Sequence, residues 1–436
     1  MRPIRTTALP LLLLLGVAAL AASSPAISSK LALDAISSDP KVADRACAAL
    51  RELGPEGLDA LFEAHAAAIA RGTADDAWPR LRAALDRVAG QHDAHASHLY
   101  WYTDLAAARA AAARLGRPIL SLRLLGNLDE DLSCANSRLF RSVLYADPAV
   151  SRTLRERFVL HWSSERPAPR ITIDYGDGRV LVRTITGNSV HYVLDPNGRV
   201  VDALPGMWGP AGFTAALNEA ASLEARLRPL TDAKEFAVER GRTYTLRPES
   251  ERKEAAMLAW DRERPAGVPT ARAATNRTRS KLVMQMPAIA ALEGARPGDG
   301  AGPRRFDPDV EAIVARERPT VSLSSATRAL LREKEGPGSG APGAGEAGDP
   351  AAEARFTARL ARLEDSIARD QALNRIALRP QIQGWIGEDG LATLEWAELN
   401  RRVYSEAFLT PADDPWMGLI DTDAFTGQDR GGLAPR

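Results

Sequence analysis

The chain has 436 residues with 56 basic and 56 acidic side chains, so its formal net charge is zero. This balance lacks the positive charge that typifies nucleic-acid-binding and membrane-surface proteins, and no nucleic-acid partner is expected. Hydrophobic residues make up 45% of the chain, which is ample for packed cores, and the length predicts about two to three domains. With only two cysteines, the fold cannot rest on a framework of disulfide bonds.

The first residues have the pattern of an export signal. Arg2 and Arg5 precede an apolar stretch at 9–20, and Ala19-Leu20-Ala21 resembles a signal-peptidase cleavage site. The apolar stretch is too short for a comfortable membrane span, although an uncleaved anchor is the alternative. We therefore expect residues 1–21 to be a signal peptide and the mature protein to be periplasmic or secreted, with no membrane span.

Residues 30–95 are expected to form a helical module. Asp39-Pro40 is typical of a helix N-cap followed by proline, and Gly54-Pro55 ends one helix and begins the next. Two short helices with this punctuation resemble a HEAT-like hairpin, which cannot bury a core alone. We therefore expect this module to pack on the domain that follows it.

Residues 99–228 alternate between helical and strand patterns, and this alternation predicts an α/β layer structure. In chain order we expect a helix ending at Gly116, a strand at 118–125, helices from about 137 and from 147, a strand at 158–162, hairpins at 171–182 and 190–204, and a helix at 210–227.

Cys134 lies between the first predicted strand and the helix that follows it. Free amides and the helix dipole stabilise a thiolate at such a position, and Asn136 or Ser137 would hydrogen-bond the sulfur. Because the spacing is Cys-x-x-Ser, a reacting thiol must form a mixed disulfide that an external thiol resolves. Nearby charges act in both directions: Arg138 and Arg141 favour a thiolate, whereas Asp129, Glu130 and Asp131 disfavour it.

The second cysteine, Cys47, falls in an amphipathic helical pattern, where a small buried thiol is the simplest interpretation. We do not expect a Cys47–Cys134 disulfide, because one cysteine lies in a helix core and the other at a helix cap.

Residues of about 99–228 resemble the thioredoxin-like superfamily, in its exported branch. The resemblance rests on the strand Gly116-Arg117-Pro118-Ile119-Leu120, the loop from Cys134 to Ser137, and the stretches 147–159 and 186–201. It implies a central mixed sheet with flanking helices and, from the Cys-x-x-Ser loop, a monothiol member.

The resemblance also implies where a substrate would bind. Asn188 and Ser189 stand where the family has a cis-proline facing the cysteine. Together with Asn136, these two residues are the implied substrate-binding residues. The inserted hairpin at 170–183 could cover them.

Two functions remain open at this point. In the first, Cys134 is the nucleophile of an exported monothiol thiol–disulfide exchange protein and Ser137 stabilises its thiolate. Its partners are client protein thiols or disulfides and an external thiol reductant, with no cofactor. In the second, the domain is a non-catalytic binding or scaffolding protein. The pKa of the thiol separates them, because exchange needs a lowered value.

Histidines offer further candidates for chemistry, although we assign no metal. His92, His95 and His98 are three residues apart and could bind zinc or copper on one helix face; solvated or packed side chains are the alternative. His161 and His191 fall in predicted strands and could approach Cys134 as a base or a metal ligand. The alternative for both is a hydrogen-bonded histidine of the sheet.

The remainder of the chain shows no recognisable family. We expect a mixed helical segment at 229–295, a flexible Gly/Pro-rich region at 296–352, and a C-terminal helical module with a structured tail at 353–436. Acidic residues of the tail could hold calcium but fit caps and turns better. Phosphate-loop, dinucleotide, haem and serine-hydrolase motifs do not occur.

Overall fold

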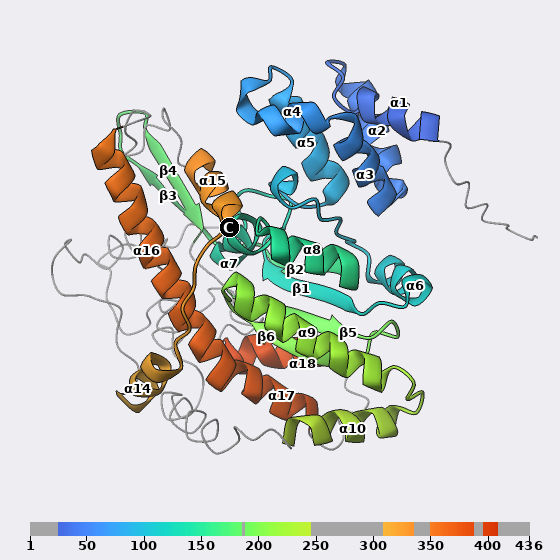
Figure 1. Ribbon diagram of the computed structural model, residues 1–436, viewed down its shortest axis with the longest axis vertical. Helices are drawn as coiled ribbons and strands as arrows, with labels where there is room; N and C mark the ends of the chain where they lie inside the picture. Colours follow the sequence, from blue (N-terminus) through green and yellow to red (C-terminus); the bar gives the residue numbers. More distant parts are fainter. Residues whose placement is uncertain (1–24, 185–187, 246–307, 335–348, 388–395, 409–436) are drawn as a thin grey trace, which may run out of the picture.

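The computed structural model describes residues 25–184, 188–245, 308–334, 349–387 and 396–408 (Figure 1). The predicted signal peptide at 1–21, residues 246–295 of the predicted mixed helical segment, and residues 409–436 of the predicted C-terminal module lie outside these residues. Within the described part of the chain, no helix combines the length and the apolar character needed to cross a bilayer.

The N-terminal part of the described chain is helical and has a core of its own. In α2 the Asp39 carboxylate accepts a hydrogen bond from the Lys41 amide, and Pro40 takes the first helical position. Leu50, Leu61 and Cys47 belong to the core of this part. Its elements are α1 (Pro25–Asp34), α2 (Pro40–Glu52), α3 (Pro55–Ala64), α4 (Ala66–Arg71), η1 (Gly72–Ala74), α5 (Trp78–Ala89) and η2 (Ala94–Ala96).

A mixed sheet follows, and its strands lie in the order β2-β1-β5-β6. The β1–β2 pair is parallel, whereas the β1–β5 and β5–β6 pairs are antiparallel. The alternation of helices and strands predicted an α/β layer structure, and the described residues confirm a mixed α/β protein with many additional helices. The strands are β1 (Ile119–Leu125), β2 (Val159–Arg166), β5 (Ser189–Leu194) and β6 (Val200–Pro205).

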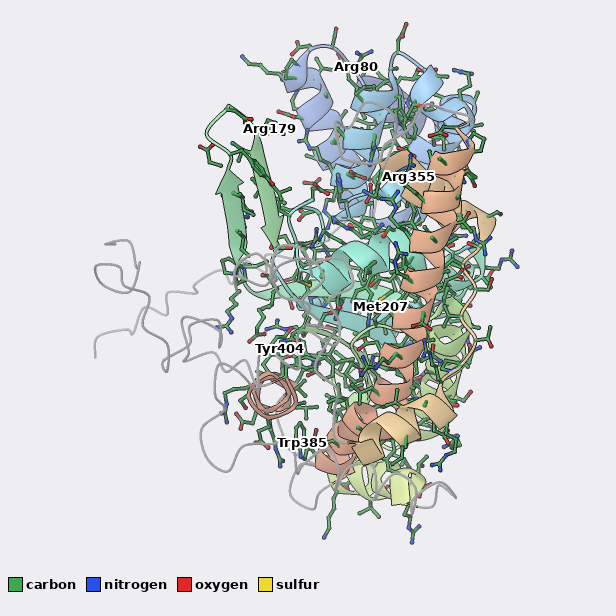
Figure 2. All side chains as sticks on the ribbon, turned by 90° about the vertical axis from the view of Figure 1, so that its left-hand side faces the viewer. Arg80, Arg179, Met207, Arg355, Trp385 and Tyr404 are labelled. Atoms are coloured by element: carbon green, nitrogen blue, oxygen red, sulfur yellow. The ribbon has the colours of Figure 1, made fainter. Side chains whose placement is uncertain are left out.

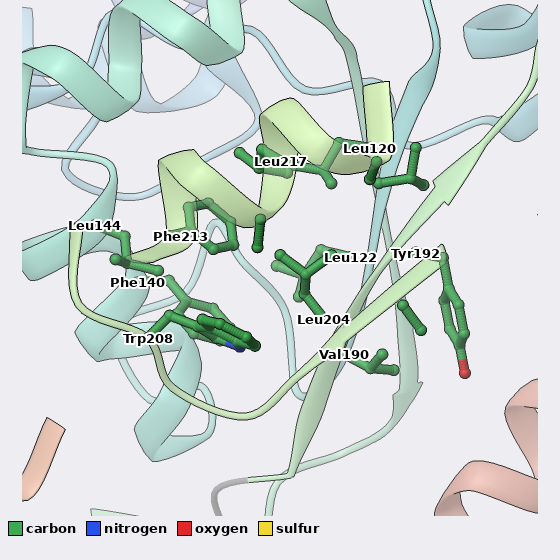
Figure 3. Close-up of a cluster of buried hydrophobic side chains, with 14 of the residues drawn as sticks. Leu120, Leu122, Phe140, Leu144, Val190, Tyr192, Leu204, Trp208, Phe213 and Leu217 are labelled. Atoms are coloured by element: carbon green, nitrogen blue, oxygen red, sulfur yellow. The ribbon is translucent and has the colours of Figure 1, made fainter. Parts of the chain in front are cut away.

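One face of this sheet packs against helices that bury its apolar side chains. Leu122 of β1 pairs in register with His191 of β5, which pairs with Leu204 of β6, so these residues share a face. Figure 3 shows Phe213 and Phe140 beside these strands. The elements around the sheet are α6 (Leu105–Leu115), α7 (Ala135–Leu139), the π-helix η3 (Phe140–Leu144), α8 (Pro148–Arg157) and α9 (Pro210–Leu227).

The segment that joins the N-terminal helices to the sheet also covers the outer edge of β2. The Tyr102 amide donates to the Leu160 carbonyl, and the Trp162 amide donates to the Tyr102 carbonyl. Arg51 of α2 donates to the carbonyls of Val88 and Trp101 at 2.8 Å each. The Arg51–Trp101 bond ties α2 to the joining segment, and the Trp162 indole of β2 donates to the Gly90 carbonyl directly after α5 at 2.8 Å.

The inserted hairpin consists of β3 (Arg170–Asp174) and β4 (Val180–Thr184), which form a separate two-stranded sheet. Figure 2 shows it standing apart from the helices, with Arg179 at its tip. Only its base reaches the cysteine loop, where the Thr184 hydroxyl donates to the Ser133 carbonyl at 2.9 Å.

The helices after residue 228 share one continuous core with the sheet. Arg379 forms a 2.7 Å ion pair with Asp202 of β6, and Asp370 accepts from the Met207 amide at 2.8 Å. These helices are α10 (Ala233–Thr245), α14 (Pro308–Glu317), α15 (Ser325–Lys334), α16 (Pro350–Leu373), the π-helices η4 (Asn374–Leu378) and η6 (Val403–Ala407), α17 (Arg379–Gly387) and α18 (Trp396–Arg402).

Helices α14 and α15 correct the prediction that residues 296–352 are flexible throughout. Residues 308–334 are helical over most of their length, and Val314, Leu323 and Leu330 are buried in this stretch. The Gly- and Pro-rich composition belongs to the sequence that flanks these two helices. Averaged over 296–352, it outweighed the short apolar patterns of the helices.

Candidate functional site around Cys134

Cys134 is the N-cap residue of α7, directly after the loop that leaves β1. Its backbone is extended (φ −61°, ψ 159°), and its amide donates to the Leu125 carbonyl at 3.1 Å. The sulfur accepts a hydrogen bond from the Ser137 amide at 3.4 Å. The local pattern therefore places the thiol at a helix N-terminus, which is the position the sequence indicated.

The thiol is nevertheless fully buried in the main core. Burial raises the pKa of Cys134, and this effect outweighs the Ser137 and Leu125 backbone groups and the charges of Arg138 and Arg141, which lower it. The thiol is therefore protonated at neutral pH in this conformation. Cys47 is also buried, and both cysteines are free thiols.

The side chains next to the thiol do not take the roles that the sequence suggested. The Ser137 hydroxyl donates to the Ser133 hydroxyl at 2.9 Å, so only the main chain of Ser137 bonds the sulfur. Asn136 is also buried, and its amide nitrogen finds no acceptor among the described residues.

Asn188 and Ser189 are buried at the start of β5, and their carbonyls are already bonded. The Asn188 carbonyl accepts from the Tyr404 hydroxyl at 3.4 Å, and the Ser189 carbonyl accepts from the Gly206 amide at 2.9 Å. Main-chain groups at these positions would have to exchange a partner before they could bind a substrate.

Three distant segments close around the cysteine loop and its helix. The base of the hairpin bonds Ser133 through Thr184. Helix α15 lies on η3, where the Thr327 hydroxyl donates to the Val143 carbonyl at 3.3 Å. Helix η6 supplies Tyr404. Because the sulfur is fully buried, the core must open before a partner could reach it.

Arg141 organises the acidic loop that precedes the cysteine. Its guanidinium is buried and donates to the carbonyls of Leu128 at 3.1 Å and Glu130 at 2.6 Å. The charge therefore serves to hold the loop, and burial lowers the pKa of Arg141 itself.

The two sheet histidines are neutral core residues. His161 Nδ1 lies 2.8 Å from the Ser121 hydroxyl, and His191 Nε2 lies 2.7 Å from the Tyr145 hydroxyl. Burial lowers the pKa of His161 to about 4 and that of His191 to about 3. Within the described residues neither ring hydrogen-bonds the sulfur, so neither acts as its base in this arrangement.

The histidines near residue 95 face separate carboxylates. His92 Nδ1 lies 2.8 Å from Asp86, and His98 Nε2 lies 2.8 Å from Asp59. His95 packs edge-on against Trp78. Within the described ranges, no three histidine, cysteine or acidic side chains form a metal-binding group.

The sequence reasoning missed the residues that cover the site. Thr327 lies in α15, within the region that the sequence analysis expected to be flexible, and Tyr404 lies in η6, within the expected C-terminal helical module. Nothing in the local sequence of either residue indicates the surface that it contacts. No protein-family model matches the chain, and no curated protein or solved structure matches it either.

Proposed function

We propose that the chain is an exported, non-catalytic binding or scaffolding protein in which a thioredoxin-like domain serves as a rigid platform. The strand order β2-β1-β5-β6 and a cysteine loop that follows β1 support the thioredoxin-like assignment. The charged start and apolar stretch of residues 1–21 support export.

The observation that carries this proposal is the burial of Cys134. Reactive cysteines are partly exposed and have a lowered pKa, whereas this thiol is fully buried and its pKa is raised. A rigid platform uses such a thiol as a small apolar core residue.

Monothiol exchange is the second candidate, and one contact favours it. The Ser137 amide already donates to the sulfur at the start of a helix, as it would to a thiolate. Exchange with a client disulfide would then require an opening of the covering segments, followed by release through an external thiol.

Incubation of the folded full chain with glutathione disulfide tests the proposal, with mass spectrometry as the readout. We expect no glutathione adduct on Cys134 over a time in which a free cysteine reacts completely, and adducts on both cysteines after denaturation. Cys47→Ser and Cys134→Ser variants assign the adducts. Rapid modification of Cys134 in the folded Cys47→Ser variant would contradict the platform proposal and support monothiol exchange instead.

A further inference from the structure

The hairpin β3–β4 exposes apolar side chains that the rest of the described chain leaves uncovered. Tyr175 is 54% exposed, Val180 55% and Val182 37%. Exposed strand edges invite pairing with another chain, and proteins normally protect them with charge, proline or a covering element.

The outward edge of β3 has a defined set of main-chain groups. The Tyr175 amide donates to the Arg179 carbonyl, so Tyr175 and every second residue before it direct their main chain toward β4. Arg170, Thr172 and Asp174 therefore direct their amides and carbonyls away from β4. Within the described ranges, β3 pairs with β4 alone.

The sequence of β3 is complementary to itself in the antiparallel direction. It reads Arg170-Ile171-Thr172-Ile173-Asp174. A two-fold axis at Thr172 places Arg170 opposite Asp174 of the partner subunit, and Ile171 opposite Ile173 of the partner subunit. Opposite charges, β-branched pairs and threonine pairs are each favourable across strands.

The main-chain geometry agrees with the same axis. Because Thr172 directs its amide and carbonyl outward, the axis makes it a hydrogen-bonded pair with its own copy, and Arg170 and Asp174 fall into hydrogen-bonded pairs as well. A slide of one strand by one residue would set outward-facing main-chain groups opposite inward-facing ones, and a slide by two residues would separate Arg170 from Asp174 of the partner subunit.

We propose that the chain forms a two-fold symmetric dimer in which the β3 edges of two copies pair antiparallel and join the two hairpins into one four-stranded sheet. The partner is a second copy because the charges and the apolar pairs of β3 match its own reversed sequence. On the exposed face, Val182 lies beside Thr172, so the dimer forms a continuous row of β-branched side chains across the sheet.

The existing contacts of the two charged residues are compatible with this pairing. Arg170 lies 3.7 Å from Glu130, and both side chains remain about half exposed (53% and 47%). Asp174 accepts from the Gly176 amide at 2.9 Å through one oxygen, Oδ1. A carboxylate accepts several hydrogen bonds, so a guanidinium can bind as well.

Sedimentation velocity on the full chain, over a range up to hundreds of micromolar, tests the dimer. A single strand edge is a small interface, so we expect a weak, concentration-dependent dimer. Thr172→Pro removes an outward amide and should abolish it without removing a bond to β4. Val182→Pro is the matched control, because it removes an outward amide from the other edge and should leave the dimer intact.

Charge reversal distinguishes pairing between the two copies from a general effect of the substitutions on the fold. Arg170→Asp alone, or Asp174→Arg alone, sets like charges opposite each other and should weaken the dimer roughly tenfold to a hundredfold. An equimolar mixture of the two variants should dimerise again, because the mixed pair is attractive at both positions. A monomeric wild type, loss of the dimer in Val182→Pro but not in Thr172→Pro, or no recovery on mixing would overturn the proposal.

Discussion

The hydroxyl of Tyr404 donates to the main-chain carbonyl of Asn188 at 3.4 Å, across 216 residues of sequence. This bond joins η6 to the start of β5. Burial, followed by the charge of Glu165, raises the pKa of Tyr404. Tyr404 and Cys134 are buried in the same core, so the C-terminal helices contribute to the enclosure of Cys134.

Removal of the Tyr404 ring should open this enclosure. Tyr404→Ala deletes a buried aromatic side chain and should lower the free energy of unfolding by roughly 3–5 kcal/mol, and thiol labelling of Cys134 should accelerate. Tyr404→Phe keeps the ring and loses one hydrogen bond, at a cost of about 1 kcal/mol, and should leave Cys134 protected.

Phe236→Ala separates local opening from general destabilisation. Phe236 is buried in α10, at the opposite end of the sheet from α7 (Figure 1). If it accelerates labelling as much as Tyr404→Ala at equal loss of stability, Tyr404 has no specific role in covering the cysteine.

Substitution of one partner in the buried ion pair between Asp202 and Arg379 should lower the free energy of unfolding far more than the same change in an exposed pair. The Asp202 side chain is fully buried and that of Arg379 is 6% exposed, and Gln383 also donates to Asp202 at 2.9 Å. Asp202→Ala removes the 2.7 Å partner of the buried guanidinium, and among the described residues its remaining ion pair is with Glu219 at 3.5 Å. We therefore expect a loss of roughly 3–5 kcal/mol in the free energy of unfolding, measured by denaturant unfolding.

Glu353→Ala is the control for this measurement. Glu353 pairs with Arg332 at 2.7 Å, but the two side chains are 61% and 57% exposed. Such a pair contributes at most about 1 kcal/mol. Equal effects of the two substitutions would contradict the view that β6 and α17 share one core.

Acidification should destabilise the protein through its buried histidines. Burial lowers the pKa of His191 to about 3 and that of His161 to about 4, from 6.5. Below pH 6.5 the unfolded chain binds protons that the folded chain does not, so stability falls until the pH passes the folded pKa. Between pH 7 and pH 5, His191 alone should lower the free energy of unfolding by about 2 kcal/mol.

His191→Gln should therefore reduce the pH dependence of the unfolding free energy by that amount. Its absolute stability at pH 7 does not enter the comparison, because each variant is compared with itself at two pH values. An unchanged pH dependence would mean that folding does not lower the pKa of His191.

Two helical glycines should respond oppositely to alanine. A Cβ on Gly57 would lie 1.9 Å from the Leu50 carbonyl oxygen, where α3 crosses α2, whereas a Cβ on Gly384 would meet no atom of the described residues within 4 Å. Gly57→Ala should destabilise by roughly 1–3 kcal/mol or more, and Gly384→Ala should stabilise by roughly 0.5–1 kcal/mol. Thermal unfolding compares both with the wild type, and a tolerated Gly57→Ala would contradict the close contact of α2 with α3.

Local features of the fold could be predicted from the sequence. The patterns at 118–125 and 210–227 agree with β1 and α9 to within one residue, because side-chain alternation and helix caps act between near neighbours. The N-cap position of Cys134 is equally local, since the Ser137 amide that bonds the sulfur is three residues away.

The burial of the site could not be predicted in the same way. Thr327 and Tyr404 bond groups that lie 184 and 216 residues away in the sequence. Helical periodicity shows which side of a helix is apolar but not which surface it covers. For the same reason the sequence suggested a separate C-terminal module, whereas these helices share the core of the sheet.

The rate at which Cys134 reacts with a maleimide in the folded Cys47→Ser variant, compared with the same variant in denaturant, tests the central claim most directly. We predict labelling at least roughly a thousandfold slower in the folded protein, because reaction must wait for an opening of the core. Labelling at the rate of an exposed thiol, with a pH midpoint below the ordinary value of about 8.5, would contradict the account and identify Cys134 as a reactive thiolate.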